Sequence, residues 1–325
     1  MRKISSVLVT ACLMCAISCA HTKMSPQETA YRSGIWSMEH HRYSEAIPYF
    51  KEAIRLNPNH ANAYYSIATC YQLLERYQES IEAAQTATHI KPDFAEAYYS
   101  LGRSYFFLKK WEETIAAATK SVTLAPDQAD AYCLLALTYG KLKRFREAAD
   151  AAEKSVSLRP DHAPSHCTLG LAYSEMGEYE KAVKSLKEAI RLNHFYAGAN
   201  CGLGLVYIRM GRYRDAIEPL TMATHLKPNY VRAYRGLTEA YLKLGEPYKS
   251  IKAAKQALAI FPQSIKARYW LGMGFLTTKD YANALKQQKI LQEKDQKLAQ
   301  QLLTEIQKSR STEDKVSEEQ SPATL

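Results

Sequence analysis

The sequence is poor in glycine and proline, and it has no apolar run long enough to cross a membrane. Its 325 residues include 13 Gly and 12 Pro, too few for a collagen-like chain or for one dominated by linkers. The main apolar stretch, residues 4–17, has about 14 residues, whereas a helix that crosses the hydrocarbon core needs roughly 20. We therefore expect a folded chain without a permanent membrane span.

Catalytic signatures are also missing. There is no HExxH, no GxSxG and no phosphate-binding lysine motif. Residues 202–204 and 272–274 resemble glycine-rich phosphate loops, but neither follows a strand pattern. His162, His166 and Cys167 provide metal-ligand types at helical spacing, yet no fourth ligand is evident. We expect no enzymatic activity, no cofactor and no metal site.

The first residues have the pattern of an export signal. Basic residues at 1–3 precede the apolar stretch, and small residues lead to Cys19. Residues 16–19 resemble the lipobox of bacterial lipoproteins, although Ala16 stands where Leu is usual. This resemblance implies a signal peptide at 1–18, a lipid on Cys19 and a tether at 19–26. Ordinary cleavage to a secreted protein and an uncleaved anchor are the alternatives.

Export also sets the compartment and the class of partner. Ala20, rather than Asp, follows Cys19, which resembles the sorting pattern of outer-membrane lipoproteins and implies an envelope protein that faces the periplasm. The formal net charge is +10, which favours anionic partners but identifies none. Because an exported chain leaves the cytoplasm, we expect no nucleic-acid partner.

Four cysteines remain beyond the signal, and three of them recur at a step of 34 residues: Cys133, Cys167 and Cys201. Equivalent positions on neighbouring helical repeats lie about 8–10 Å apart, whereas a disulfide needs Cα atoms within about 7 Å. We therefore predict that these cysteines and Cys70 are free packing residues. A ladder of soft metal ligands is the alternative.

The step of 34 residues governs most of the chain. Prolines occur at positions 58, 92, 126, 160, 228 and 262, with His194 in the remaining place. If this position is number 32 of a repeat, eight repeats fill residues 27–298. They begin at Gln27, Ala61, Ala95, Ala129, Ala163, Ala197, Val231 and Ile265.

Each repeat has the pattern of two helices. Position 11 is aromatic in seven repeats, which accounts for part of the excess of 23 Tyr over 8 Phe. Positions 8 and 20 are small, so the two helices can approach closely. We expect the polar residue after position 32 to cap the next helix. These residues are Asn59, Asp93, Asp127, Asp161 and Asn229.

The pattern Tyr98-x-x-Leu101-Gly102-x-x-Tyr105, with Ala46, Phe50 and Pro58 at the later signature positions, resembles the tetratricopeptide repeat. The resemblance implies an all-α, right-handed superhelical solenoid of about eight helix-turn-helix repeats. Residues 295–309 are predicted to form a solvating C-terminal helix that overlaps the end of the last repeat. Residues 310–325 are predicted to be a disordered tail.

The same resemblance implies a binding groove along the first helix of each repeat, at positions 2, 5, 9, 12 and 13. A groove of this kind binds protein or peptide segments, so the chain is expected to be a non-catalytic scaffold. Pilus or secretin assembly and the docking of cell-wall enzymes are the settings implied. The predicted groove residues are Tyr65, Tyr99, Arg103, Phe106, Phe107, Leu137, Leu171, Leu205, Arg232, Arg235, Lys243, Lys266 and Tyr269.

Two alternatives apply to this groove. The aromatic residues of repeats two and three could instead pack against their own neighbours, because aromatic stripes on helices are usually core. The basic end formed by Arg232, Arg235, Lys243 and Lys266 could be an ordinary solvated face, or could bind an envelope glycan or polyanion. Binding to a polyanion would weaken steeply with added salt.

Overall fold

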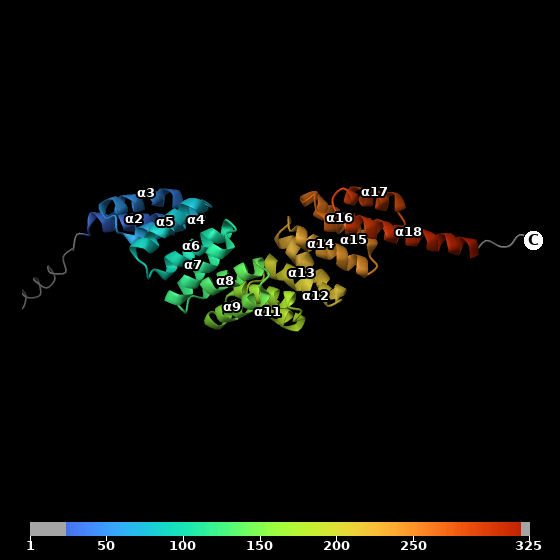
Figure 1. Ribbon diagram of the computed structural model, residues 1–325, viewed down its shortest axis with the longest axis horizontal. Coiled ribbons are helices and arrows are strands. Elements are labelled where there is room, and N and C mark those ends of the chain that lie inside the picture. Colours follow the sequence, from blue (N-terminus) through green and yellow to red (C-terminus); the bar gives the residue numbers. More distant parts are fainter. Residues whose placement is uncertain (1–23, 320–325) are drawn as a thin grey trace, which may run out of the picture. The chain divides into compact units, whose positions relative to one another are not determined.

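The computed structural model describes residues 24–319, and for residues 313–319 it describes the backbone alone. Seventeen helices and no strands occur in this part of the chain (Figure 1). They are α2 (Pro26–Glu39), α3 (Tyr43–Leu56), α4 (Ala61–Leu73), α5 (Tyr77–Ile90), α6 (Ala95–Phe107), α7 (Trp111–Leu124), α8 (Ala129–Lys141), α9 (Phe145–Leu158), α10 (Ala163–Glu175), α11 (Tyr179–Leu192), α12 (Ala197–Arg209), α13 (Tyr213–Leu226), α14 (Val231–Lys243), α15 (Pro247–Ile260), α16 (Ile265–Thr277), α17 (Tyr281–Gln292) and α18 (Gln296–Glu319).

The predicted signal peptide, Cys19 and the tether up to residue 23 lie outside the described residues, as do residues 320–325. Within residues 24–319, no helix combines the length and the apolar character that a membrane span requires.

The helices form the predicted repeats, and the predicted all-α array of helix pairs is confirmed. The first helices of repeats two to eight begin at the predicted starts of those repeats, from Ala61 to Ile265. The chain divides into an N-terminal unit, residues 1–138, and a C-terminal unit, residues 139–325. The boundary falls within α8. Each unit is a row of antiparallel helix pairs, and the two are described separately.

In the first two repeats of the N-terminal unit, the side chains at positions 8 and 24 have complementary sizes. A Cβ atom on Gly34 would lie 2.5 Å from the ring of Phe50, which is fully buried. In the second repeat both positions are alanine, Ala68 and Ala84. Ser80, at position 20, donates a hydrogen bond of 2.8 Å to the carbonyl of Ala68. Positions 8 and 20 therefore make the close helix contact that was predicted.

The C-terminal unit repeats this arrangement with leucine as the large partner. A Cβ atom on Gly170 would lie 2.6 Å from Leu186, and Gly204 faces Leu220 in the same way. Both leucines are fully buried. Glycine is needed at these two positions because the leucine of the second helix occupies the space that a side chain would fill.

The turn inside each repeat has a left-handed residue at position 15. Five of these residues are not glycine, as at Lys143 (φ 61°), whereas repeats five to seven have glycine there, as at Gly177 (φ 81°). The next amide closes the turn by donating to the carbonyl of position 11, as Arg212 does to Tyr207 at 2.9 Å. The Arg212 guanidinium lies 4.6 Å from the centre of that tyrosine ring. The recurrent aromatic at position 11 thus supports the turn as well as the core.

The predicted caps are wrong. The helix after each inter-repeat turn begins one residue later than capping by Asn59 or its equivalents requires, so the N-cap falls on position 34. His60 and Ser264 occupy that position and accept hydrogen bonds from the amides of Ala63 and Ala267. The residue at position 33 cannot cap the helix because it lies inside the turn between the repeats. In the first of these turns the amide of His60 donates to the carbonyl of Asn57 at 3.1 Å.

Helix α18 closes the C-terminal unit. Asp295 accepts a hydrogen bond of 3.0 Å from the amide of Leu298 and so caps its start. Ala299, Leu302 and Ile306 are buried against α16 and α17. The helix continues to Glu319, beyond the predicted boundary between a helix at 295–309 and a disordered tail from residue 310.

The cysteines predicted to be packing residues, Cys70, Cys133, Cys167 and Cys201, are buried and form no disulfide. Burial raises the pKa of the Cys70 thiol to about 12 and also raises the pKa of Cys201. Both thiols therefore stay protonated at neutral pH and are poor nucleophiles.

Candidate functional site

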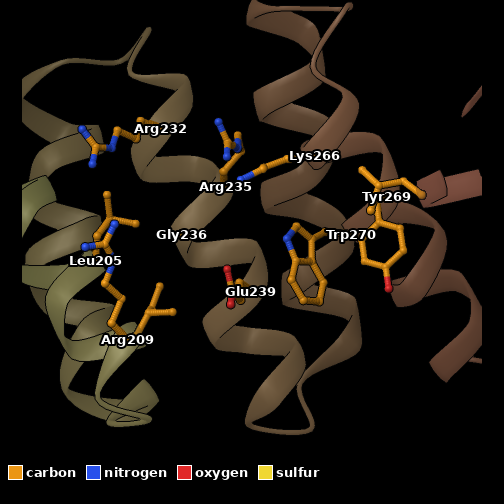
Figure 2. Close-up of a pocket in the computed structure, with 11 residues that line it drawn as sticks. Leu205, Arg209, Arg232, Arg235, Gly236, Glu239, Lys266, Tyr269 and Trp270 are labelled. Carbon is orange, nitrogen blue, oxygen red and sulfur yellow. The ribbon is translucent and has the colours of Figure 1, made fainter. Parts of the chain in front are cut away.

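A pocket of about 510 Å³ opens in the C-terminal unit between α12, α14 and α16, with the start of α18 at its edge (Figure 2). We call it the basic pocket. The first helices of repeats six, seven and eight supply its walls, so neighbouring repeats present side chains side by side. It is lined by Leu205, Ile208, Arg209, Arg232, Arg235, Gly236, Glu239, Lys266, Tyr269, Trp270 and Leu298.

The base of the basic pocket is apolar and its far wall is aromatic. Leu205 packs against the core of the C-terminal unit. Gly236 leaves room above it, because a Cβ there would approach Leu220 to 3.0 Å and Leu205 to 3.2 Å. On α16, the rings of Tyr269 and Trp270 lie 5.3 Å apart at an angle of 69°. Such a surface can accept apolar or flat groups from a ligand.

The arginines of the basic pocket differ in how they are engaged. Arg209 is held by the end of α10: it donates to the Ser174 carbonyl at 2.8 Å and forms an ion pair of 2.6 Å with Glu175. Arg235 is half-buried, and its buried Nε has no hydrogen-bond partner. Burial lowers the pKa of Arg235, and the positive charge of Arg232 lowers it further. Arg235 and Arg232 both line the basic pocket with positive charge, so an anionic group placed between them would be favoured.

Glu239 brings one carboxylate into this basic setting. Burial raises its pKa above the usual value, and the nearby charges of Lys243, Lys266 and Arg235 offset part of that rise. Glu239 and Trp270 both line the basic pocket (Figure 2). The basic pocket therefore combines a mostly positive rim with one acidic group, rather than a uniformly positive surface.

The structure brings five predicted groove residues together in the basic pocket: Leu205, Arg232, Arg235, Lys266 and Tyr269. Lys243 is the last residue of α14 and is exposed outside the lining, near enough for its charge to act on Glu239. Leu171, on α10, packs against the core of the C-terminal unit.

The selected groove positions missed Gly236 and Trp270, which both occupy position 6 of their repeats. This position holds Gly202, Gly236 and Trp270 in repeats six to eight. The change from glycine to tryptophan at this position in adjacent repeats could have indicated a pocket. Glycine leaves a space on one helix, and the tryptophan ring forms a wall of that space on the next helix.

The predicted aromatic residues of the N-terminal unit form a separate cluster at the end of α6. Phe107 is 51% exposed, and its ring stacks on Tyr77 with centres 4.7 Å apart. Phe106 meets Phe107 edge-on at 6.0 Å and Trp111 at 5.4 Å. These side chains lie beside the first residues of α5 and α7, and they contact one another while leaving part of Phe107 open to solvent.

The other predicted residues of the N-terminal unit are dispersed. Tyr65 is half-buried against the ring of Phe94, 5.1 Å away, and burial raises the pKa of its phenol. The Arg103 guanidinium lies 5.7 Å from the centre of the Tyr99 ring. Leu137 is 37% exposed on α8.

Metal chemistry finds no support in the described part of the chain, where no group of three His, Cys, Asp or Glu side chains could hold an ion. The basic pocket instead offers groups for noncovalent binding. Its guanidinium and ammonium groups can bind oxygen atoms of a ligand, and its aromatic rings can pack against apolar groups.

Solved structures share the fold. A chain of the Cut9–Hcn1 APC/C hetero-tetramer superposes with a TM-score of 0.65 at 18% identity, covering 82% of this chain and 52% of that chain. The present chain therefore spans about half the length of that relative. A tetratricopeptide repeat protein from Parabacteroides merdae gives a TM-score of 0.59 at 13% identity, covering 77% of this chain and 99% of that one. PilF of Pseudomonas aeruginosa gives 0.57 at 15% identity, covering 64% and 95%.

A search of curated protein sequences gave no match. Family models give the decisive result. Models described as TPR or tetratricopeptide repeats match residues 37–104, 95–128, 129–162, 151–184, 170–211, 201–265 and 237–297. Helix pairs with a period of 34 residues, the matched volumes at positions 8 and 24, and these matches all agree, and the chain belongs to the tetratricopeptide-repeat family.

Proposed function

We propose that this protein is a non-catalytic scaffold of the bacterial envelope, anchored by a lipid on Cys19, which binds a segment of a partner protein in the basic pocket. The tetratricopeptide fold supports an interaction scaffold. The observation that carries the proposal is the basic pocket itself, where Arg235, whose buried Nε has no hydrogen-bond partner, shares the lining with the half-buried rings of Tyr269 and Trp270.

The chemistry of the basic pocket favours a protein segment over a polyanion. An anionic polymer would place repeated negative charges beside Glu239, whose carboxylate is itself partly buried in the lining. A protein segment can direct an acidic or carbonyl oxygen to Arg235 and an apolar side chain to Trp270. Binding of this kind repays the ordering of an extended or helical segment.

Site-specific crosslinking tests where the partner binds. A photoreactive residue replaces Tyr269 in the basic pocket or, as the control, Tyr248, which is 78% exposed on α15 and outside the pocket. We expect one protein to be captured from position 269 in living cells and not from position 248. Equal capture from both positions would contradict binding at the basic pocket.

Affinity for the captured partner then tests the role of Arg235. We expect Arg235→Ala to weaken binding about tenfold or more, because a hydrogen bond to a charged group contributes about 1.5–3 kcal/mol and 1.4 kcal/mol corresponds to tenfold. Arg214→Ala, on α13 and outside the lining, is the matched control. A ligand that is a polysaccharide, with an affinity that falls steeply with salt, would favour the polyanion alternative.

The anchor is tested separately. A fatty acid carrying an alkyne should label the wild-type chain in cells and should not label Cys19→Ser. Fractionation of the same cells shows whether the labelled chain reaches the outer membrane. Release of an unlabelled wild-type chain into the soluble fraction would contradict the lipid anchor.

A further inference from the structure

The first repeat ends the N-terminal unit with an apolar face. Trp36 on α2 is 51% exposed and Tyr49 on α3 is 46% exposed, and Met24 beside them is 47% exposed. These three side chains line a hollow of about 340 Å³ together with Arg32 and other residues of α2. We call Met24, Trp36 and Tyr49 the terminal face.

The size of Trp36 breaks the pattern of the repeats. It occupies position 10, where every other repeat has a small or medium side chain that is buried. Position 10 of a later repeat faces the repeat before it, since a Cβ on Gly274 would lie 2.8 Å from Ile251 on α15. The equivalents of Trp36 are Cys70, Ser104, Thr138, Ala172, Val206, Ala240 and Gly274.

Tyr49 breaks the pattern in the same direction. It occupies position 23, where repeats two to seven have only alanine, serine or proline. Ala83 and Ala117, its equivalents in the next two repeats, are less than 10% exposed. Two positions that are small inside the array are therefore aromatic on the one face of the unit against which no described helix packs.

A terminal repeat normally keeps its outer face polar, because that face meets water. Here three large apolar side chains lie exposed among polar residues of α2, so contact with an apolar surface would bury them favourably. The distance to Cys19 limits what this can be. Met24 lies five residue steps after Cys19, and at about 3.4 Å per step this span reaches about 17 Å at full extension.

We propose that the terminal face lies on the lipid bilayer, with Trp36 and Tyr49 in the headgroup region. This proposal rests on the anchor at Cys19, which would hold the first repeat against the membrane. Trp and Tyr favour this region because their rings are apolar and their N–H or O–H groups can bond to water and headgroups.

The charges around the terminal face are compatible with contact to either neutral or anionic lipid. Arg42 lies 5.6 Å from the centre of the Trp36 ring and pairs with Glu45 at 3.6 Å. Arg32 pairs with Glu28 at 2.7 Å. Each arginine is thus balanced by a carboxylate, so the apolar area of the aromatic rings, rather than net charge, should drive the contact.

Fluorescence of Trp36 tests the proposal without relying on lipidation in the cell. The chain from Cys19 to Leu325 is coupled through Cys19 to a maleimide lipid in vesicles with more phosphatidylcholine than phosphatidylglycerol. The other four cysteines are buried and should not react. Trp111→Phe with Trp270→Phe leaves Trp36 as the sole tryptophan of three. The matched control keeps Trp111 alone, through Trp36→Phe with Trp270→Phe.

We expect vesicles to shift Trp36 emission to shorter wavelength, and phosphatidylcholine brominated on its acyl chains to quench it, while Trp111 changes in neither respect. Thermal melting of both variants verifies that they fold. Trp36 emission that is unaffected by vesicles would overturn the proposal. A shift that grows with protein concentration in the absence of vesicles would also overturn it, because a second copy would then cover the face. Failure of fatty-acid labelling in cells would contradict the anchor, whereas the vesicle measurement supplies the tether chemically and so tests the contact by itself.

Discussion

At the scale of single residues, the turn at position 15 determines which substitutions the repeats tolerate. All eight repeats place this residue in the left-handed region, although only three have glycine there. For other residues that conformation costs roughly 1–2 kcal/mol. The remaining five turns therefore carry a local cost, which the packing on both sides of the turn offsets.

Gly177→Ala should lower the free energy of unfolding by about 1 kcal/mol, because alanine is strained at positive φ. No atom lies within 4 Å of a Cβ built at Gly177, so the cost comes from the backbone alone. Gly140→Ala is the matched control: its Cβ also meets open space, but Gly140 lies in α8. There alanine should stabilise by up to about 1 kcal/mol. Urea denaturation measures both, and two changes of the same sign would contradict the argument.

Glu239 should make stability depend on pH. Its pKa is raised by burial, so the folded chain holds the proton more tightly than the unfolded chain. The free energy of unfolding therefore increases as the pH falls through the raised pKa of Glu239. Above that pKa the buried carboxylate is charged, and its full destabilising effect is present. Glu239→Gln should raise the free energy of unfolding at pH 7, with an advantage that shrinks near pH 4.5, the ordinary value. Glu180→Gln, on the exposed side of α11, is the control. An advantage that does not change with pH would contradict this cause.

Some residues of the basic pocket could be predicted from the sequence, and others could not. Arg232, Arg235 and Lys266 follow from the resemblance to tetratricopeptide repeats, which implies that positions 2 and 5 of each first helix face the groove. The partnerless Nε of Arg235 and the engagement of Arg209 by α10 could not be predicted, since both depend on the distance between neighbouring repeats. The spacing alone also gave no reason to place Phe106 against Trp111.

At the scale of helices, α18 acts as an unpaired first helix that closes the array. Leu302 is fully buried and fills the space beside Gly272, where a Cβ would lie 2.5 Å from it. Leu302→Ala should cost about 2–5 kcal/mol, as cavities left by buried leucines do. Hydrogen exchange should show faster exchange in α16–α18. Leu303→Ala, at a partly exposed position on the same helix, should cost less, and equal losses would show that burial against Gly272 is not the cause.

The helix starts were predictable because the proline at position 32 ends one helix and the repeat period fixes the next. The identity of the N-cap residues could not be predicted. Cap position depends on how many residues the turn after the proline uses, and the sequence offers polar candidates at two successive positions, such as Asn59 and His60. The length of α18 could not be predicted either, because the composition beyond residue 310 is that of a solvated segment.

At the scale of the whole molecule, stability should be local rather than shared. In a repeat protein each repeat contacts its neighbours alone, so stability is a sum over adjacent interfaces. The division of the chain within α8 was not predictable, since the 34-residue pattern passes through residues 129–141 without interruption.

Phe50→Ala tests this locality. The buried ring fills the space beside Gly34, so its loss should cost about 3–5 kcal/mol. We expect amide exchange to accelerate in α2–α5 while the amides of α12–α17 stay protected. Leu220→Ala, in the C-terminal unit, should give the converse pattern. Equal acceleration throughout the chain after either change would show that the array unfolds as one cooperative body.

The pairing of glycine with phenylalanine or leucine, and of alanine with alanine, also bears on how such an array can grow. Both members of each pair lie within a single stretch of 34 residues, as Gly204 and Leu220 do. Duplication or exchange of a complete stretch therefore transfers the glycine together with the large side chain that packs against it. A crossover between the two helices of such a repeat would instead separate the glycine from its leucine, and a larger residue in place of the glycine would clash with that leucine. Viable recombinants should therefore be those spliced at the prolines.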